Sequence, residues 1–416
     1  MSRITSPIAR ILTATDRPGI EARLAERFDA AAVAELSAAR DARILALDTE
    51  LPGLAGQLAA ALRAAGAVAR TAGSLVATVA TPAQLAAAKS AWPALAAELD
   101  ALAAGLARAT QPRPFFRLRE RSLDLREEAR VMGILNVTPD SFYERVAGVS
   151  EAVARAAAMA ADGAALVDIG GQSYAHWNPT VAAAEERDRV VPAVAAIIAA
   201  RTDIAVSIDT FKASVAEAAL AAGAHLINDC SGLSDPLLAE TVARYDAALV
   251  VMHLKGELNV RSAKTYVYGD ALAEIVEFLH ERTERARAAG VGADAIAIDP
   301  GLEFGKEPQT DLEILDRFGE LTALGYPILL ASSRKSFIGR LFNRPAVGLL
   351  VPSLATAGLG IAAGARLLRV HDVAETVALA QMYAAVHPRR RRAQVFAERM
   401  PGTPAQVGNS TPPSAV

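Results

Sequence analysis

The sequence predicts an α/β fold, a (β/α)8 TIM barrel, preceded by a small α+β domain. Three observations support this prediction. From residue 131 onward, eight short aliphatic runs alternate with helical stretches, which is the element order of such a barrel. A polar side chain closes nearly every run, at the point where barrel active sites form. The 416 residues also exceed one ordinary domain, so we expect the residues before the first run to fold separately.

The first part of the chain mixes short strands with helices. ARILALD (42–48) and SLVATVAT (74–81) have the composition of strands. PGLAGQLAAALRAAG (52–66) predicts an amphipathic helix closed by a glycine, and residues 81–109 predict one or two more helices. The region carries no catalytic motif, so we interpret it as a structural or oligomerising domain. Segment 110–125 predicts a linker or a hairpin across the base of a barrel.

We divide the chain into an α+β domain (1–112), a barrel (113–395) and a disordered tail (396–416). The tail is polar and rich in proline, which favours disorder. The predicted barrel strands are VMGILNV (131–137), ALVDIGG (165–171), IAVSIDT (204–210), LINDCS (226–231), ALVVMHL (248–254), AIAIDPG (295–301), PILLASS (327–333) and LLRVHD (367–372). The absence of a GxGxxG motif argues against a doubly wound dinucleotide-binding sheet.

The composition excludes several classes of protein and site. Hydrophobic residues make up 52% and charged residues 21%, which suits a globular chain. A net charge of −3 argues against a basic nucleic-acid binder. The single cysteine, Cys230, excludes an intrachain disulfide and a cysteine-rich metal site. We see no secretion signal and no apolar run of 18 residues, so we expect a cytoplasmic protein without membrane contact.

The polar residues at the strand ends predict one binding site. They are Asn136, Asp168, Asp209, Asn228, His253, Asp299, Arg334 with Lys335, and Arg369 with His371. Because the carboxyl ends of barrel strands meet at one mouth, we expect these groups to converge there.

The chemistry of this set suggests two halves. Asp209, Asn228 and Asp299, with Lys335, can pair with a flat heterocycle that carries amino and ring N–H donors. A cationic and polar half, made of Asn136, Ser336, Arg369 and His371, suits a phosphate or pyrophosphate, with or without Mg²⁺. Phe304 and Met252 can pack against the ring faces. The residues therefore predict a heterocycle with a phosphorylated arm, bound for group transfer.

These residues lie in segments that resemble the pterin-binding barrel of the dihydropteroate synthases over about 127–386. The segments are MGILNVTPDSF (132–142), DIGGQS (168–173), SIDTFK (207–212), INDCSG (227–232), VMHLKG (251–256), DPGLEFGK (299–306), SRKSFIG (333–339) and RVHDV (369–373). Eight motifs in order are specific for the superfamily. They are less specific for the activity, because methyltetrahydrofolate methyltransferases use a related barrel.

The resemblance implies a role for each residue. Asp209, Asn228, Asp299 and Lys335 would hold a 7,8-dihydropterin ring between Met252 and Phe304. Asn136, Arg369 and His371 would bind the pyrophosphate and Mg²⁺, with Asn136 as the metal ligand, and Ser336 would serve the 4-aminobenzoate end. Lys335, Arg369 and His371 would be the catalytic residues. In the family reaction, pyrophosphate leaves the pterin methylene and a neutral arylamine attacks the cation-like carbon. We expect small-molecule substrates and a homodimer.

The chain departs from the family pattern at three places. The family's second loop reads GGESTRPG, whereas this chain has Gln172, Ser173, Tyr174, Ala175, His176 and Trp177 after its two glycines. The first loop continues Phe142–Arg145 and is about two residues shorter than the family pattern. Glu303 replaces a glycine before Phe304.

These departures leave four hypotheses open. The chain is a dihydropteroate synthase or a close variant, or a paralogue that binds the pterin pyrophosphate but uses another acceptor or none. A methyltransferase that moves a methyl group to a corrinoid is a third hypothesis, which SRKSFIG and RVHDV disfavour. A non-catalytic pterin-binding protein is the fourth.

Overall fold

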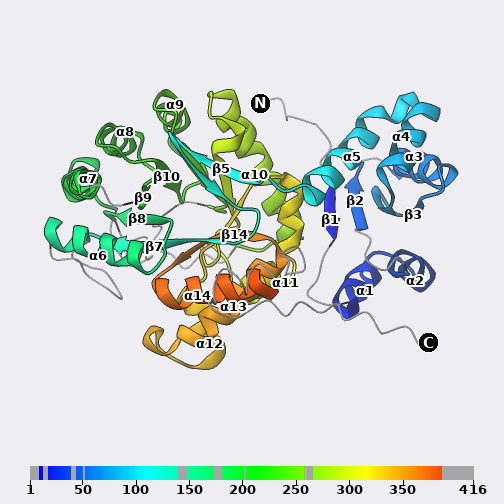
Figure 1. The fold of residues 1–416 in the computed structure, drawn as a ribbon. Coiled ribbons are helices and arrows are strands. Elements are labelled where there is room, and N and C mark those ends of the chain that lie inside the picture. Colours follow the sequence, from blue (N-terminus) through cyan, green and yellow to red (C-terminus); the bar gives the residue numbers. More distant parts are fainter. Residues whose placement is uncertain are drawn as a thin grey trace, which may run out of the picture.

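The computed structural model describes residues 9–12, 17–38, 44–49, 52–138, 148–172, 180–200, 203–256, 258 and 266–386. Within these residues, eight parallel strands close into a barrel in chain order, from β7 round to β14, which pairs with β7 (Figure 1). The strands are β7 (Arg130–Asn136), β8 (Leu166–Gly170), β9 (Ala205–Asp209), β10 (Leu226–Asp229), β11 (Ala248–Met252), β12 (Ile296–Asp299), β13 (Ile328–Leu330) and β14 (Ala365–Val370). The predicted barrel and its eight strands are confirmed.

Helices connect the strands and cover the outside of the barrel. They are α6 (Val149–Ala161), α7 (Ala183–Ala199), α8 (Ala213–Ala221), α9 (Leu238–Arg244), α10 (Ala271–Ala288), α11 (Pro308–Asp316), α12 (Ser336–Phe342), α13 (Leu350–Ala363) and α14 (Val373–Val386), with the 3-10 helices η2 (Ala293–Ala295), η3 (Phe318–Leu324) and η4 (Ala346–Gly348). Outward-facing strand residues such as Val167, Ile208 and Leu249 pack against buried helix residues in one large core. Inward and outward residues alternate because successive side chains of a strand point to opposite faces.

A hairpin closes the base of the barrel. It consists of β5 (Phe115–Leu118) and β6 (Arg121–Asp124). Phe116 and Leu118 are fully buried against the inward-facing residues at the start of the barrel strands, among them Met132 and Leu226. Of the two alternatives for segment 110–125, the structure therefore shows the hairpin across the base.

The N-terminal region forms an antiparallel sheet with helices on both faces. Its described elements are β1 (Arg10–Leu12), α1 (Arg17–Ala25), α2 (Ala30–Ser37), β2 (Ile44–Asp48), α3 (Pro52–Ala64), β3 (Val68–Ala72), β4 (Leu75–Val79), α4 (Pro82–Ala91), η1 (Pro93–Leu95) and α5 (Ala96–Thr110), and the strand order is β1-β2-β4-β3. Leu45 and Leu47 face α3, α4 and α5, whereas Ile44 and Ala46 face α1 and α2. This alternation within β2 explains why the strand is apolar on both faces. The predicted α+β domain is confirmed.

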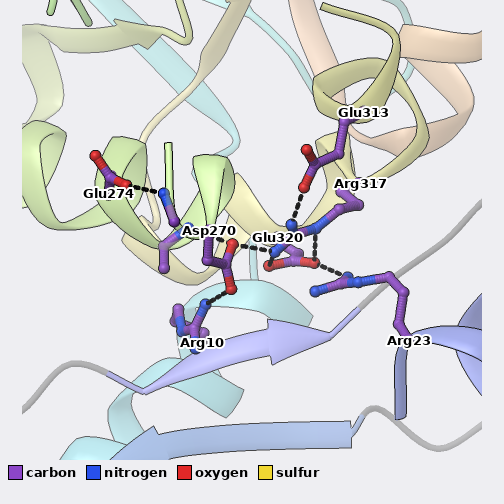
Figure 2. A network of polar contacts seen from close by, with 9 residues as sticks. Arg10, Arg23, Asp270, Glu274, Glu313, Arg317 and Glu320 are labelled. Atoms are coloured by element: carbon purple, nitrogen blue, oxygen red, sulfur yellow. Dashed lines mark hydrogen bonds and ion pairs between the residues drawn. The ribbon is translucent and has the colours of Figure 1, made fainter. Parts of the chain in front are cut away.

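The N-terminal domain packs against one side of the barrel through apolar and charged contacts. Ala323 of η3 belongs to the apolar core of the N-terminal domain. Figure 2 shows the adjoining ion pairs, in which Arg317 contacts Asp270 at 2.7 Å and the fully buried Glu320 at 3.0 Å. From the N-terminal domain, Arg10 reaches Asp270 at 3.1 Å and Arg23 reaches Glu320 (Figure 2).

The charges in this interface stabilise one another. Burial by itself would raise the pKa of Asp270, but Arg317 and Arg10 outweigh burial and the pKa is lowered. Burial by itself would lower the pKa of Arg317, but Glu320 and Asp270 raise it. The interface therefore depends on charge pairs that are largely removed from water.

In the described residues, no helix is long and apolar enough to cross a membrane.

Candidate active site in the barrel mouth

The strand alternation places a polar layer above the apolar layer of the barrel interior. Met132, Leu166, Ala205 and Leu226 lie in the lower, apolar layer. Two or four residues later on the same strands stand Asn136, Asp168, Asp209 and Asn228, which therefore point to the same interior. Asp299 and Arg369 each follow an inward-facing apolar residue of their strand by two positions. These six side chains therefore point into the barrel as predicted, because side chains two residues apart on a strand face the same side.

Asp168 is the centre of the polar layer. Its carboxylate is fully buried, and it accepts hydrogen bonds from Ser207 Oγ at 2.5 Å, Asn228 Nδ2 at 3.0 Å and Arg369 Nε at 2.6 Å. The sequence predicts Asp168 at the mouth without a binding role, and Ser207 is absent from the predicted set. Their signal was available, because both lie two residues before the inward-facing end of their strands.

Arg369 joins two carboxylates. Besides Asp168, its guanidinium donates from Nη2 to Asp209 at 2.8 Å. Burial raises the pKa of Asp209 to about 7, and Arg369 opposes that rise while Asp168 adds to it. The sequence predicts Arg369 in a cationic half, separate from the carboxylates. The structure corrects this division, because buried carboxylates need a partner and Arg369 is long enough to reach both.

Asp299, at the end of β12, lies near Lys335, which follows β13 in the chain. Burial raises the pKa of Asp299, and the nearby Lys335 opposes this shift. Lys335 Nζ donates to the carbonyl of Leu302 at 2.5 Å and lies 5.0 Å from the centre of the Phe304 ring. Phe304 packs against the cluster that contains Met252, as does Phe211, which the sequence analysis did not select. The two predicted ring-flanking residues are therefore neighbours.

A glycine fixes the loop after β12. Gly301 donates its N–H to Asp299 Oδ1 at 2.7 Å and has a φ of 68°, in the left-handed region. A Cβ atom at this position would lie 2.1 Å from the backbone oxygen of His253. Only glycine allows the loop to fold back so closely, and this turn orients the carboxylate of Asp299.

The residues predicted for the phosphate side lie near the rim. Burial and the nearby Arg369 lower the pKa of His371 to about 4, so its imidazole is neutral at pH 7 in this structure. Its Nδ1 is 3.1 Å from Ser333 Oγ. Ser336 is exposed at the start of α12. His371 is therefore polar rather than charged at neutral pH.

Two residues expected at the mouth do not face it. His253 is buried on the outside of β11, where its ring is 4.9 Å from the ring of Phe278 in α10. Met252 faces inward, so its neighbour His253 must face outward. Arg334 pairs with Asp372 at 2.5 Å and donates to the carbonyl of Ala346, which makes it an anchor between loops.

The rewritten loops are only partly described. Phe142–Arg145, Ser173–Trp177 and the tail 396–416 lie outside the described residues. Gln172 is described and buried, and its Oε1 accepts from Lys212 Nζ at 2.6 Å and from the Val181 N–H at 3.1 Å. Lys212 also pairs with the buried Glu186. Among the described residues, Lys212 therefore pairs with one carboxylate, Glu186, and with the amide of Gln172.

Comparisons with known proteins agree with this geometry. The family model for pterin binding enzymes matches residues 132–371. Dihydropteroate synthase of Bacillus subtilis (strain 168) is 38% identical over 268 residues, which cover 64% of this chain and 91% of that protein. The inactive dihydropteroate synthase 2 of Mycobacterium bovis is 38% identical over 266 residues, which cover 62% of this chain and 83% of that protein. A structure of Xanthomonas albilineans dihydropteroate synthase with 4-aminobenzoic acid is 39% identical and has a TM-score of 0.61, covering 66% of this chain and 98% of that one.

Proposed function

Because this chain belongs to the pterin binding enzyme family, among the dihydropteroate synthases, we propose that it is a transferase that joins a dihydropterin to an arylamine. The substrates would be 7,8-dihydropterin-CH₂ pyrophosphate and 4-aminobenzoate, in folate biosynthesis. The observation that carries the proposal is the buried group of Asp168, Asp209, Asn228 and Asp299 near Arg369 at the barrel mouth, together with the apolar cluster that contains Met252 and contacts Phe304.

The pocket suits the pterin ring. Carboxylates and an amide on different strands of the barrel accept hydrogen bonds from amino and ring N–H groups, and flat apolar side chains cover the ring faces. Asp209 and Asp299 have pKa values raised by burial, so a donor-rich ring is the kind of partner that compensates their charge. We assign Asp209, Asn228, Asp299 and Lys335 to the ring edge.

The rim suits the pyrophosphate arm and Mg²⁺. Asn136 Oδ1 lies beside Gly170, where a Cβ atom would come within 3.0 Å of it, so the missing side chain leaves this oxygen uncovered. Mg²⁺ prefers oxygen ligands and is commonly held by few protein groups together with substrate phosphates. Accordingly, the described residues contain no cluster of three His, Cys, Asp or Glu that could hold a metal by themselves. We propose Asn136 as the protein ligand, and the ion would neutralise charge on the departing pyrophosphate.

The reaction needs little proton transfer from the protein. The C–O bond between the pterin methylene and pyrophosphate breaks, and its electron pair leaves with the phosphate oxygen. The lone pair of the arylamine nitrogen then forms the C–N bond, and the nitrogen loses its proton to solvent. Arg369 and Lys335 would stabilise the departing negative charge, with His371 as a neutral hydrogen-bond partner. We propose these three as the catalytic residues.

A binding-only paralogue is the second candidate. The Mycobacterium bovis relative whose name marks it as inactive is as similar to this chain as the Bacillus subtilis synthase. The second loop of this chain also lacks the family's Thr-Arg-Pro sequence. Such a protein would bind the pterin pyrophosphate and fail to condense it with 4-aminobenzoate.

We also propose a homodimer. Large apolar side chains are exposed on α12, on η4 and on the packed pair α13 and α14, namely Leu341, Phe342, Val347, Val351, Leu359, Met382 and Val386. A second copy would remove this surface from water.

A cytoplasmic location stays a prediction from the sequence.

A single-turnover assay tests the function. Protein, dihydropterin pyrophosphate and Mg²⁺ are mixed with and without 4-aminobenzoate, and pyrophosphate and dihydropteroate are quantified. Formation of dihydropteroate supports the synthase. Pterin binding without product supports the binding-only paralogue, and no pterin binding contradicts both.

A further inference from the structure

Glu303 occupies an unusual position in the pocket wall. It lies between Leu302 and Phe304 and has a φ of 69°, in the left-handed region that glycine adopts readily and other residues adopt at a cost. Gly301 and Gly305, on either side of it, have similar φ values of 68° and 65°. A residue with a side chain is retained in this conformation only where surrounding contacts compensate.

Those contacts join two loops of the mouth. Glu303 Oε1 accepts the backbone N–H of Phe337, in the first turn of α12, at 2.7 Å. On either side of Glu303, the carbonyl of Leu302 accepts from Lys335 Nζ, and the ring of Phe304 lies under the same ammonium group. Three consecutive residues after β12 thus contact the segment 335–337 after β13.

The backbone of Glu303 is held as well. Its N–H donates to Asp311 Oδ1 at 2.9 Å, and Asp311 is buried. In the same loop, Lys306 Nζ donates to the carbonyls of Gly301 and Phe304 at 2.7 and 3.1 Å. Asp311 and Lys306 therefore hold the backbone of the loop after β12 in place. The Glu303 carboxylate of this fixed loop binds the first turn of α12.

We propose that Glu303 is a positioning residue that holds Lys335 over Phe304 and so fixes one wall of the pterin pocket. It fastens the first turn of α12 to the loop after β12, and Lys335 precedes that turn directly. Without this contact, Lys335 and Phe304 would keep their chemistry but lose their fixed separation. This inference rests on the proposed pterin-binding function.

Three substitutions separate the contact from the backbone conformation. Glu303→Ala removes the contact and keeps the left-handed cost, Glu303→Gly removes both, and Glu303→Gln keeps an oxygen that can accept the Phe337 N–H. Glu307→Ala is the matched control, because Glu307 is an exposed carboxylate in the same segment. Affinity for dihydropterin pyrophosphate is measured by calorimetry, melting by circular dichroism, and kcat and KM in the presence of 4-aminobenzoate.

We expect the Ala and Gly variants to bind the pterin about three- to tenfold more weakly, the size of one lost hydrogen bond. In these two variants, the KM for the pterin should rise, whereas kcat should stay within about twofold of the parent value. The Gln and Glu307→Ala variants should have the affinity, KM and kcat of the parent. The Gly variant should melt above the Ala variant, because glycine relieves the backbone cost.

Unchanged pterin affinity in the Ala variant, or a Gln variant as weak as Ala, would overturn the proposal. If the parent protein fails to bind the pterin at all, the proposed function fails. Parent binding with indifferent variants overturns only the role of Glu303. Should the parent bind without turnover, the calorimetric comparison alone decides.

Discussion

The guanidinium of Arg369, on the last barrel strand, donates to the carboxylate of Asp168, on the second, across 2.6 Å. The same guanidinium reaches Asp209 on the third strand at 2.8 Å. Because burial penalises each of these charges, the three side chains stabilise one another before any substrate arrives. The pocket is therefore arranged in advance, which is the condition under which fixed charges accelerate a reaction.

Replacing Arg369 should destabilise the barrel. Arg369→Met leaves Asp168 and Asp209 buried without their cation, and we expect the free energy of unfolding to fall by about 3–5 kcal/mol. Urea denaturation measures this change. The double variant Asp168→Asn with Arg369→Met should recover part of the loss. A loss below about 1 kcal/mol in the single variant would show that solvent already compensates these charges.

The ring-edge residues should determine pterin affinity. Asp209→Ala, Asn228→Ala and Asp299→Ala should each weaken dihydropterin binding at least roughly tenfold, because each removes a hydrogen bond that contributes about 1.5–3 kcal/mol. Calorimetry measures the affinity. Asp294→Ala, in a surface pair with Arg117 at the barrel base, is the control and should bind normally. Normal binding by all three pocket variants would contradict the assignment.

The stability of the free protein should depend on pH through Asp209. Its folded-state pKa is raised to about 7, above the ordinary value of 3.8, so the stability from its protonated form is present at low pH. That stability is lost as pH rises from about 4 to about 7. Relative to Asp209→Asn, the unfolding free energy of the parent should therefore fall by up to about 1.4 kcal/mol per pH unit over this window. Urea unfolding at pH 5 and pH 7 compares the two, and a constant difference would refute the raised pKa.

Restoring the family's second loop should raise synthase activity. Ala175 stands where the family has an arginine, so a cation that would meet the pyrophosphate is absent from the loop sequence. We expect weak turnover of 4-aminobenzoate by the parent and faster turnover by Tyr174→Thr, Ala175→Arg, His176→Pro, with pterin binding retained in both proteins. Steady-state kinetics measures both. If the parent already turns over at a rate normal for the family, another cation supplies the charge, and Arg145 is the first candidate.

The buried charges between the two domains should stabilise their contact. Glu320 is fully buried between Arg317 and Arg23, whereas Glu313 contacts the same Arg317 with a side chain that is 40% exposed. Glu320→Ala should lower the unfolding free energy by about 3–5 kcal/mol and Glu313→Ala by no more than about 1 kcal/mol. Denaturation of both variants, with limited proteolysis to detect separation of the domains, checks this. Equal effects would mean that burial of Glu320 is unimportant for the contact.

Some differences between the predicted and the observed site follow from the local sequence pattern. Met252 and His253 are adjacent on a strand, so they cannot both face the barrel interior, and the structure places His253 outside. Asp168 and Ser207 lie in step with the inward-facing positions of their strands. By contrast, β1 has three residues, too few to show an alternation, and its place depends on pairing with β2.

The sequence by itself determined the barrel, the small domain before it and the end of the barrel where the polar side chains gather. These features follow from the local sequence pattern. Side chains alternate between the two faces of a strand, which determines which of them face inward, and the residues that flank each strand determine where it ends. The tertiary structure decided which of these side chains meet. The Arg369–Asp168 pair spans 201 positions, Glu303 reaches α12 from 34 positions away, and Arg23 reaches Glu320 over 297. Such contacts depend on how the closed barrel and the packing of the N-terminal domain bring distant segments together. Local periodicity carries no information about that arrangement.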